Sequence, residues 1–125
     1  MPTGLLLSDD LIFSSRITAT ARAAGVAVKA VRGADQLLAL AEKEGPSCVI
    51  VDLANPTLQI ADFIRRLHES ATPRPRVVAY GSHVDTATLR AAREAGCDLV
   101  LPRSKFVEDL SRELPAWMNQ NAGTP

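Results

Sequence analysis

The sequence lacks a surplus of either charge. Its 125 residues include 14 Lys and Arg and 14 Asp and Glu, so the formal net charge at pH 7 is zero and the isoelectric point lies near 6.7. Proteins that bind nucleic acid or anionic membranes through phosphate contacts usually carry a basic excess. We therefore expect no direct nucleic-acid partner and no membrane partner for this chain.

Long hydrophobic runs, cysteine pairs and aromatic residues are also scarce. No apolar run approaches the 18 residues of a membrane span, and no basic segment of the kind that opens a signal peptide precedes Leu5. Cys48 and Cys97 form neither a CxxC pair nor a zinc pattern, so we expect two buried free thiols in a reducing, cytoplasmic protein. With five aromatic residues, stacking platforms for bases are not expected.

What the sequence does contain is a fivefold alternation of short apolar runs and longer segments with helical spacing. The runs are three to six residues long: 5–7, 26–31, 48–51, 77–80 and 99–101. Such runs are typical of strands buried on both faces of a parallel sheet. The helical segments lie near 11–24, 34–44, 57–71, 85–95 and 105–114. We expect one domain over residues 1–118 and a frayed tail over residues 119–125.

Several residues mark where these helices begin and end. Gly25, Gly45 and Gly96 stand where left-handed C-terminal stops are expected, and Asp85 and Ser104 are candidate N-caps. Pro115 is expected to end or kink the last helix. Strands that alternate with helices at this spacing predict an α/β fold, in which a five-stranded parallel sheet is doubly wound in a flavodoxin-like order, a (βα)5 sandwich.

The residues after each predicted strand are the candidates for a functional site, because ligands of open parallel sheets bind outside the carboxyl ends of the strands. They are Ser8, Asp9 and Asp10; Asp52; Gly81, Ser82 and His83; and Pro102, Arg103 and Ser104. Two carboxylates about 5 Å apart repel each other by roughly 3 kcal/mol at an effective dielectric of 20. A magnesium ion held by Asp9, Asp10 and Asp52 would offset this repulsion.

Asp52 beside such an ion could attack a phosphoryl group and form an aspartyl phosphate. The alternative for any of these aspartates is an ordinary structural role, as a helix N-cap or an exposed side chain.

Two segments resemble the receiver (CheY-like) domains of bacterial response regulators. The segment 49–56, VIVDLANP, is similar to their phosphoacceptor segment, and 95–101, AGCDLVL, is similar to the segment before and within their fifth strand. The strand and helix order matches from about Gly4 to Trp117. The resemblance implies that Asp52 is the phosphoacceptor and that an acidic pair binds Mg2+. It also implies two protein partners, a histidine kinase or phosphotransfer protein and a downstream protein. The oligomeric state is not predicted, and a homodimer is one alternative.

The sequence departs from the receiver pattern at four places. An acidic pair can be Asp9 and Asp10, but a register one residue earlier would pair Ser8 with Asp9. Gly81 stands where the family has Thr or Ser, with Ser82 one position late, and Arg103 after Pro102 replaces the family's lysine before a proline. Val100 replaces the usual aromatic of the fifth strand. Gly81, Ser82 and Arg103 remain the expected contacts of a phosphoryl group.

Two functions follow as hypotheses. The first is an atypical receiver that is phosphorylated on Asp52 with Mg2+ and signals by protein contact, with no enzymatic activity beyond its own phosphorylation and dephosphorylation. The alternative is a pseudo-receiver that binds its partner without phosphorylation. A flavin or nucleotide carrier and a hydrolase are disfavoured, because the chain has no GxGxxG, GxxxxGK[ST] or GxSxG sequence. His68 is predicted to be a solvated surface residue, whereas Trp117 is either a partner-facing anchor or packed on the last helix.

Overall fold

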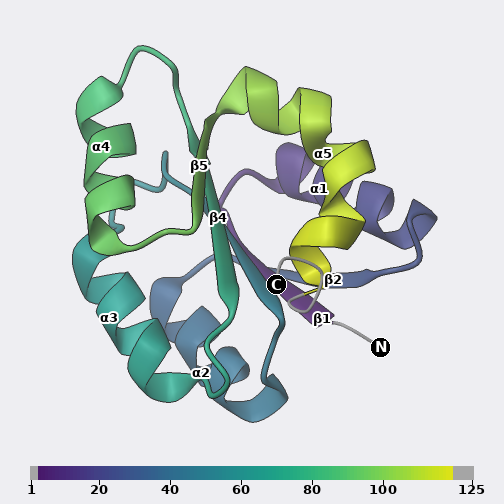
Figure 1. Ribbon diagram of the computed structural model, residues 1–125, viewed down its shortest axis with the longest axis horizontal. Coiled ribbons are helices and arrows are strands. Elements are labelled where there is room, and N and C mark those ends of the chain that lie inside the picture. Colours follow the sequence, from purple (N-terminus) through teal and green to yellow (C-terminus); the bar gives the residue numbers. More distant parts are fainter. Residues whose placement is uncertain (1–2, 120–125) are drawn as a thin grey trace, which may run out of the picture.

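The computed structural model describes residues 3–119 and confirms the predicted architecture (Figure 1). Five parallel strands form one sheet in the order β2-β1-β3-β4-β5. The strands are β1 (Thr3–Leu7), β2 (Ala27–Val31), β3 (Cys48–Asp52), β4 (Arg76–Gly81) and β5 (Leu99–Pro102). The helices are α1 (Leu11–Ala23), α2 (Ala34–Glu44), α3 (Ile60–Ser70), α4 (Thr86–Ala95) and α5 (Arg103–Met118). Of the tail predicted for residues 119–125, all but Asn119 lies outside the described residues.

The helices form two layers, one on each face of the sheet. Figure 1 shows α1 and α5 on one side and α2, α3 and α4 on the other. Alternate residues of each strand point to opposite faces, so Leu6 and Ile50 join the core under α1 and α5, whereas Leu5 and Val49 join the core under α2 and α3. Two separate apolar cores therefore hold the carboxyl ends of the strands in fixed relative positions.

Burial of the strands follows their place in the sheet. Every residue of the central strand β3 is buried, as its continuous apolar sequence predicts. By contrast, β2 is an edge strand whose residues Ala27, Lys29 and Ala30 are exposed, so the prediction of burial on both faces is wrong for this run. Its Lys29 reaches Glu44 at the end of α2 with 2.8 Å between Nζ and Oε1, and a charge of this kind on an edge strand opposes pairing with another chain.

The predicted ends of the first four helices are largely correct. Gly25, Gly45 and Gly96 have φ values of 80°, 57° and 104°, a region that glycine adopts without steric cost. The Asp85 carboxylate accepts the Thr88 N–H at 3.2 Å and caps α4. The third helix begins at Ile60 and not at residue 57, because residues 54–59 form the connection that leaves the carboxyl end of β3.

The last helix differs most from its prediction. It starts at Arg103, with Pro102 as its N-cap residue, so Ser104 lies inside the helix and is not its cap. It also continues through Pro115 to Met118. Pro115 removes one helical N–H, but Trp117 and Met118 are 5% and 1% exposed, and burying these two side chains outweighs the loss of one hydrogen bond.

Four of the five aromatic side chains form one column in the core under α1 and α5. Tyr80 and Phe106 are stacked with 4.4 Å between ring centroids, Phe106 and Trp117 are stacked at 5.6 Å, and Phe13 meets Tyr80 edge-on at 5.3 Å. Trp117 therefore packs on α5 and is not a partner-facing anchor. The column runs from the site edge of the sheet to the last turn of α5.

The other side chains singled out in the sequence have mixed outcomes. Cys48 is buried, Cys97 is half-buried and both are free, and burial raises the pKa of each thiol to about 12. His68 is half-buried and so only partly solvated, and its Nε2 is buried without a hydrogen-bond partner among the described residues. The reason is its position at the end of α3, where its ring lies beside Gly96. No helix within residues 3–119 is long and apolar enough to span a membrane.

Candidate functional site

Asp52 ends the central strand β3, and its carboxylate is buried and hydrogen-bonded on both oxygens. The residue is 3% exposed. Oδ2 accepts the Ser8 hydroxyl at 2.8 Å, and Oδ1 accepts the backbone N–H of Ala54 at 2.9 Å. Bonds of this kind stabilise the charged carboxylate inside the protein. They also leave no oxygen of Asp52 without a protein donor.

Ser8 occupies the position beside Asp52 that the sequence left open between two registers. Leu7 pairs with Val51 in the sheet, so the next residues, Ser8 just past β1 and Asp52 at the end of β3, lie beside each other. Ser8 is 1% exposed, and its Oγ accepts the Asp10 N–H at 3.2 Å while it donates to Asp52. The structure thus places a hydroxyl, and not one of the two following carboxylates, against the predicted phosphoacceptor.

Asp10 is engaged in a structural role. Its Oδ1 accepts the Phe13 N–H at 2.9 Å and caps α1, and its Oδ2 lies 3.3 Å from Nη2 of Arg103. The backbone hydrogen bond from Phe13, assisted by Arg103, lowers the pKa of the Asp10 carboxyl. The N-cap alternative weighed from the sequence therefore describes Asp10.

The predicted trio of metal ligands is not assembled in the structure. Asp9 is exposed, Asp10 is held by the α1 cap and Arg103, and Asp52 is held by Ser8 and Ala54. Among residues 3–119, no three His, Cys, Asp or Glu side chains lie close enough together to bind one metal ion. A magnesium site built on Asp9, Asp10 and Asp52 does not fit this arrangement.

Arg103 lies where the chain leaves β5 and α5 begins. Its guanidinium carbon sits 4.2 Å from the centroid of the Phe13 ring, a cation–π contact, while Nη2 pairs with Asp10. Both partners of that ion pair are more than a third exposed, so the pair contributes little to stability. The predicted cation is therefore present at the site edge, directed at Asp10.

A cavity of about 460 Å³ opens at this edge. It is lined by Asp52, Ala54, Tyr80, Gly81, Ser82, His83, Arg103 and Ser104. The structure thus brings Gly81, Ser82 and Arg103 together with Asp52, as the sequence predicted. A Cβ at Gly81 would lie 3.3 Å from Cβ of Leu53, on the side of α3 and α4, and glycine supplies no hydroxyl there.

Tyr80 is the site residue that sequence reasoning missed. It is fully buried, it lines the cavity, and its hydroxyl has no hydrogen bond of acceptable geometry to any described residue. The hydroxyl is close enough to Asp52 and Ser8 to sense them: burial first, and then the charge of Asp52, raise the pKa of Tyr80. Its place as the last apolar residue before Gly81 was a signal that could have identified it.

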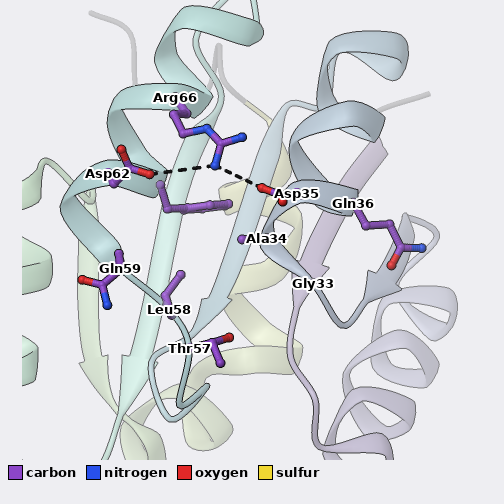
Figure 2. A pocket seen from close by; sticks show the side chains of 10 residues that line it. Gly33, Ala34, Asp35, Gln36, Thr57, Leu58, Gln59, Asp62 and Arg66 are labelled. Carbon is purple, nitrogen blue, oxygen red and sulfur yellow. Dashed lines mark hydrogen bonds and ion pairs between the residues drawn. The ribbon is translucent and has the colours of Figure 1, made fainter.

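A second hollow, of about 330 Å³, lies between the first turns of α2 and α3. Figure 2 shows Arg66 on its wall between two carboxylates, with Nη1 3.0 Å from Asp35 and 3.8 Å from Asp62. All three side chains are well exposed. None of the site residues predicted from the sequence lines this hollow.

Comparison with solved structures finds receiver domains that match nearly the whole chain. The receiver domain of Ssk1 from Saccharomyces cerevisiae, solved with the phosphotransfer protein Ypd1, superposes with a TM-score of 0.81 at 16% identity, over 98% of this chain and 92% of that chain. A putative response regulator from Chloroflexus aurantiacus gives a TM-score of 0.81 at 19% identity, over 94% and 98%. The receiver domain of a sensor histidine kinase from Pseudomonas aeruginosa, solved with magnesium in its active-site cleft, gives 0.79 at 21%, over 94% and 97%.

These likenesses establish that the chain has the receiver-domain fold. No protein-family model and no curated protein matches its sequence.

Proposed function

We propose that this chain is a receiver-type signalling module that acts by protein contact, with Asp52 held in a state that does not depend on phosphorylation. The single observation that carries this proposal is the 2.8 Å hydrogen bond from Ser8 to a carboxylate that is 3% exposed. The proposed partner is a histidine kinase or phosphotransfer protein, and the yeast receiver solved with Ypd1 supports that kind of partner. A downstream protein is the second expected contact.

Phosphoryl transfer to Asp52 is disfavoured by electrostatics. A carboxylate that accepts a phosphoryl group needs cations to neutralise the incoming oxygens. The loss of one unit of positive charge 4 Å from those oxygens costs about 4 kcal/mol at an effective dielectric of 20. A cost of this size in the transition state slows phosphoryl transfer roughly a thousandfold. Asp10 and Arg103 neutralise each other at 3.3 Å, and Ser8 replaces a carboxylate beside Asp52.

A slow phosphoacceptor is the second candidate. It is favoured by one observation: Asp52 lines an open cavity with Arg103 on its wall. Mg2+ would have to bind through Asp52 and fewer carboxylates than the predicted three.

One experiment separates the two candidates. The protein is incubated with acetyl phosphate and Mg2+, and its intact mass is compared with that of Asp52→Asn. We expect no phosphoryl adduct on the wild type, and we expect the Ser8→Asp variant, which restores a carboxylate beside Asp52, to gain one. An adduct on the wild type that Asp52→Asn abolishes would overturn the proposal and establish the slow phosphoacceptor.

Partner binding provides the positive test. Affinity for purified phosphotransfer proteins and histidine kinases of the same organism is measured for the wild type and Asp52→Asn. A partner that binds both within twofold supports the proposal. Binding that requires acetyl phosphate and intact Asp52 contradicts it.

A further inference from the structure

Tyr80 lies directly beside Asp52 in the sheet, on the same face. The two residues are register partners on the parallel strands β4 and β3, so their side chains point to the same side. That side is the core under α1 and α5, to which Tyr80 and Ile50, two residues before Asp52, both belong. Ser8 follows β1, the other neighbour of β3, and points the same way, because Leu6 belongs to the same core. The Asp52 carboxylate therefore stands between two hydroxyl side chains.

The aromatic column holds the Tyr80 hydroxyl in this place. Tyr80 is 0% exposed, its ring is stacked on Phe106 at 4.4 Å, and Phe13 meets it edge-on at 5.3 Å. A ring packed in this way cannot turn its hydroxyl toward solvent without opening the core. The hydroxyl oxygen is itself shielded from water, so its O–H group is left to interact with Asp52 and Ser8.

Both hydroxyls act on Asp52 as neutral donors. Burial, and then the charge of Asp52, raise the pKa of Tyr80, so its hydroxyl keeps its proton at neutral pH. Ser8 donates its proton to Oδ2 of Asp52 at 2.8 Å. A carboxylate accepts up to about four hydrogen bonds, and Asp52 receives two, from Ser8 and from the N–H of Ala54. Its charge is thus balanced by neutral donors, with capacity left for the dipole of Tyr80.

A divalent cation needs the opposite surroundings. Mg2+ binds carboxylate oxygens in octahedral geometry and keeps several of its water molecules. Asp52 is 3% exposed and Ser8 is 1% exposed, and the Tyr80 hydroxyl beside them is buried, so this side of Asp52 is closed to a hydrated ion. Hydroxyl donors also direct the positive ends of their dipoles at the carboxylate, which lowers its attraction for a cation.

We propose that the Ser8 and Tyr80 hydroxyls take the place of a metal ion at Asp52, and that Tyr80 is the positioning residue that keeps divalent cations from binding there. The inference rests on the proposed function, because it explains how a buried carboxylate is held without phosphorylation. It goes further in assigning this role to Tyr80 and in making the site independent of Mg2+. The arrangement around Asp52 then stays the same at any Mg2+ concentration.

The experiment is a titration of the 15N-labelled full chain with MgCl2, without a phosphodonor, followed by the amide NMR signals of Ser8, Asp52 and Ala54. Sodium chloride at equal ionic strength gives the background. We expect no saturable shift for the wild type. Ser8→Asp, which replaces one hydroxyl with a carboxylate, should bind Mg2+ saturably. Removal of the second hydroxyl in Ser8→Asp/Tyr80→Phe should tighten that binding about three- to tenfold.

Two control variants separate the hydroxyl from charge and from packing. Ser15→Asp adds the same carboxylate at an exposed serine of α1 that does not line the cavity at Asp52, and it should give no saturable shift. Ser8→Asp/Trp117→Phe loosens the far end of the aromatic column and leaves the Tyr80 hydroxyl in place. Its melting temperature should fall, but its Mg2+ affinity should stay within twofold of Ser8→Asp. A merely structural role of Tyr80 would change the affinity of both double variants alike.

Two results would overturn the inference. The first is saturable Mg2+ binding by the wild type; this titration needs no substitution, so a variant that fails to fold does not remove the test. The second is equal Mg2+ affinity, or no binding, in both Ser8→Asp and Ser8→Asp/Tyr80→Phe, which would show that Tyr80 does not exclude the ion. Failure of the proposed function has a different signature, a phosphoryl adduct on the wild type in acetyl phosphate. A wild type that binds Mg2+ and forms no adduct overturns this inference alone.

Discussion

Removal of the Ser8 hydroxyl tests whether the Asp52 carboxylate depends on its hydrogen bond. Ser8→Ala leaves Oδ2 of Asp52 without its donor at a residue that is 3% exposed. A hydrogen bond to a charged group contributes about 1.5–3 kcal/mol to the free energy of unfolding. At roughly 3–6 °C per kcal/mol for a domain of this size, the melting temperature should fall by about 5–18 °C.

A double-mutant cycle separates this bond from other effects of the substitution. Asp52→Asn preserves shape and removes the charge, so Ser8→Ala should cost about 0.5–1.5 kcal/mol in that background. The coupling between the two positions should then be about 1 kcal/mol or more. The measurement is urea unfolding followed by circular dichroism. The m-value, the slope of the free energy of unfolding against urea concentration, should be the same for the four proteins.

Ser14→Ala is the matched control. Ser14 is buried like Ser8, with 5% of its surface exposed against 1% for Ser8, but its hydroxyl has no hydrogen-bond partner among the described residues. It lies within α1, where alanine is the better helix former by about 0.5 kcal/mol. Ser14→Ala should be neutral or stabilising. The reasoning is refuted if Ser8→Ala costs under about 0.5 kcal/mol, or if its cost is the same with Asn at position 52.

Three further predictions concern the fold. Burial, and then the charge of Arg74, lower the pKa of His68 from 6.5. As the pH falls, the unfolded chain takes up the proton first, so this contribution to the free energy of unfolding is complete above pH 6.5 and is lost below it. His68→Gln should remove this part of the pH dependence in urea titrations, and an unchanged pH profile would contradict the prediction. Phe106→Ala should destabilise by about 3–5 kcal/mol, whereas Val84→Ala, at a side chain 74% exposed, should stay within about 0.5 kcal/mol in the same assay. Gln59 makes no side-chain bond as N-cap of α3, so Gln59→Ser should stabilise by about 0.5–1 kcal/mol, and a loss in thermal unfolding would refute this.

The parts of the fold that sequence predicted are those that local chemistry decides. Five apolar runs gave the five strands, and Gly25, Gly45 and Gly96 marked three helix ends because few other residues tolerate a positive φ. Asp85 capped its helix as expected, because the bond to Thr88 lies within one turn. Pro115 misled the prediction because its local penalty is smaller than the burial of Trp117, which only the tertiary structure reveals.

The location of the candidate site could be predicted from the sequence, but the contacts among its side chains could not. Topology brings Asp52, Ser82 and Arg103 to one edge, and strand ends suffice to see this. Whether Ser8 or Asp9 stands beside Asp52 depends on one residue of register, which the sequence left open. The pairing of Arg103 with Asp10 joins residues 93 positions apart, and no periodicity reports such a contact.

The aromatic column also determines which part of the molecule optical spectroscopy can monitor. The one tryptophan and the one tyrosine of the sequence both lie in the core under α1 and α5, and Phe63 is the sole aromatic residue in the core on the other face. Intrinsic fluorescence and near-ultraviolet circular dichroism will therefore follow one layer of the sandwich. A loosening confined to α2, α3 and α4 would leave both signals almost unchanged, so optical unfolding curves need amide hydrogen exchange beside them before they are taken as global.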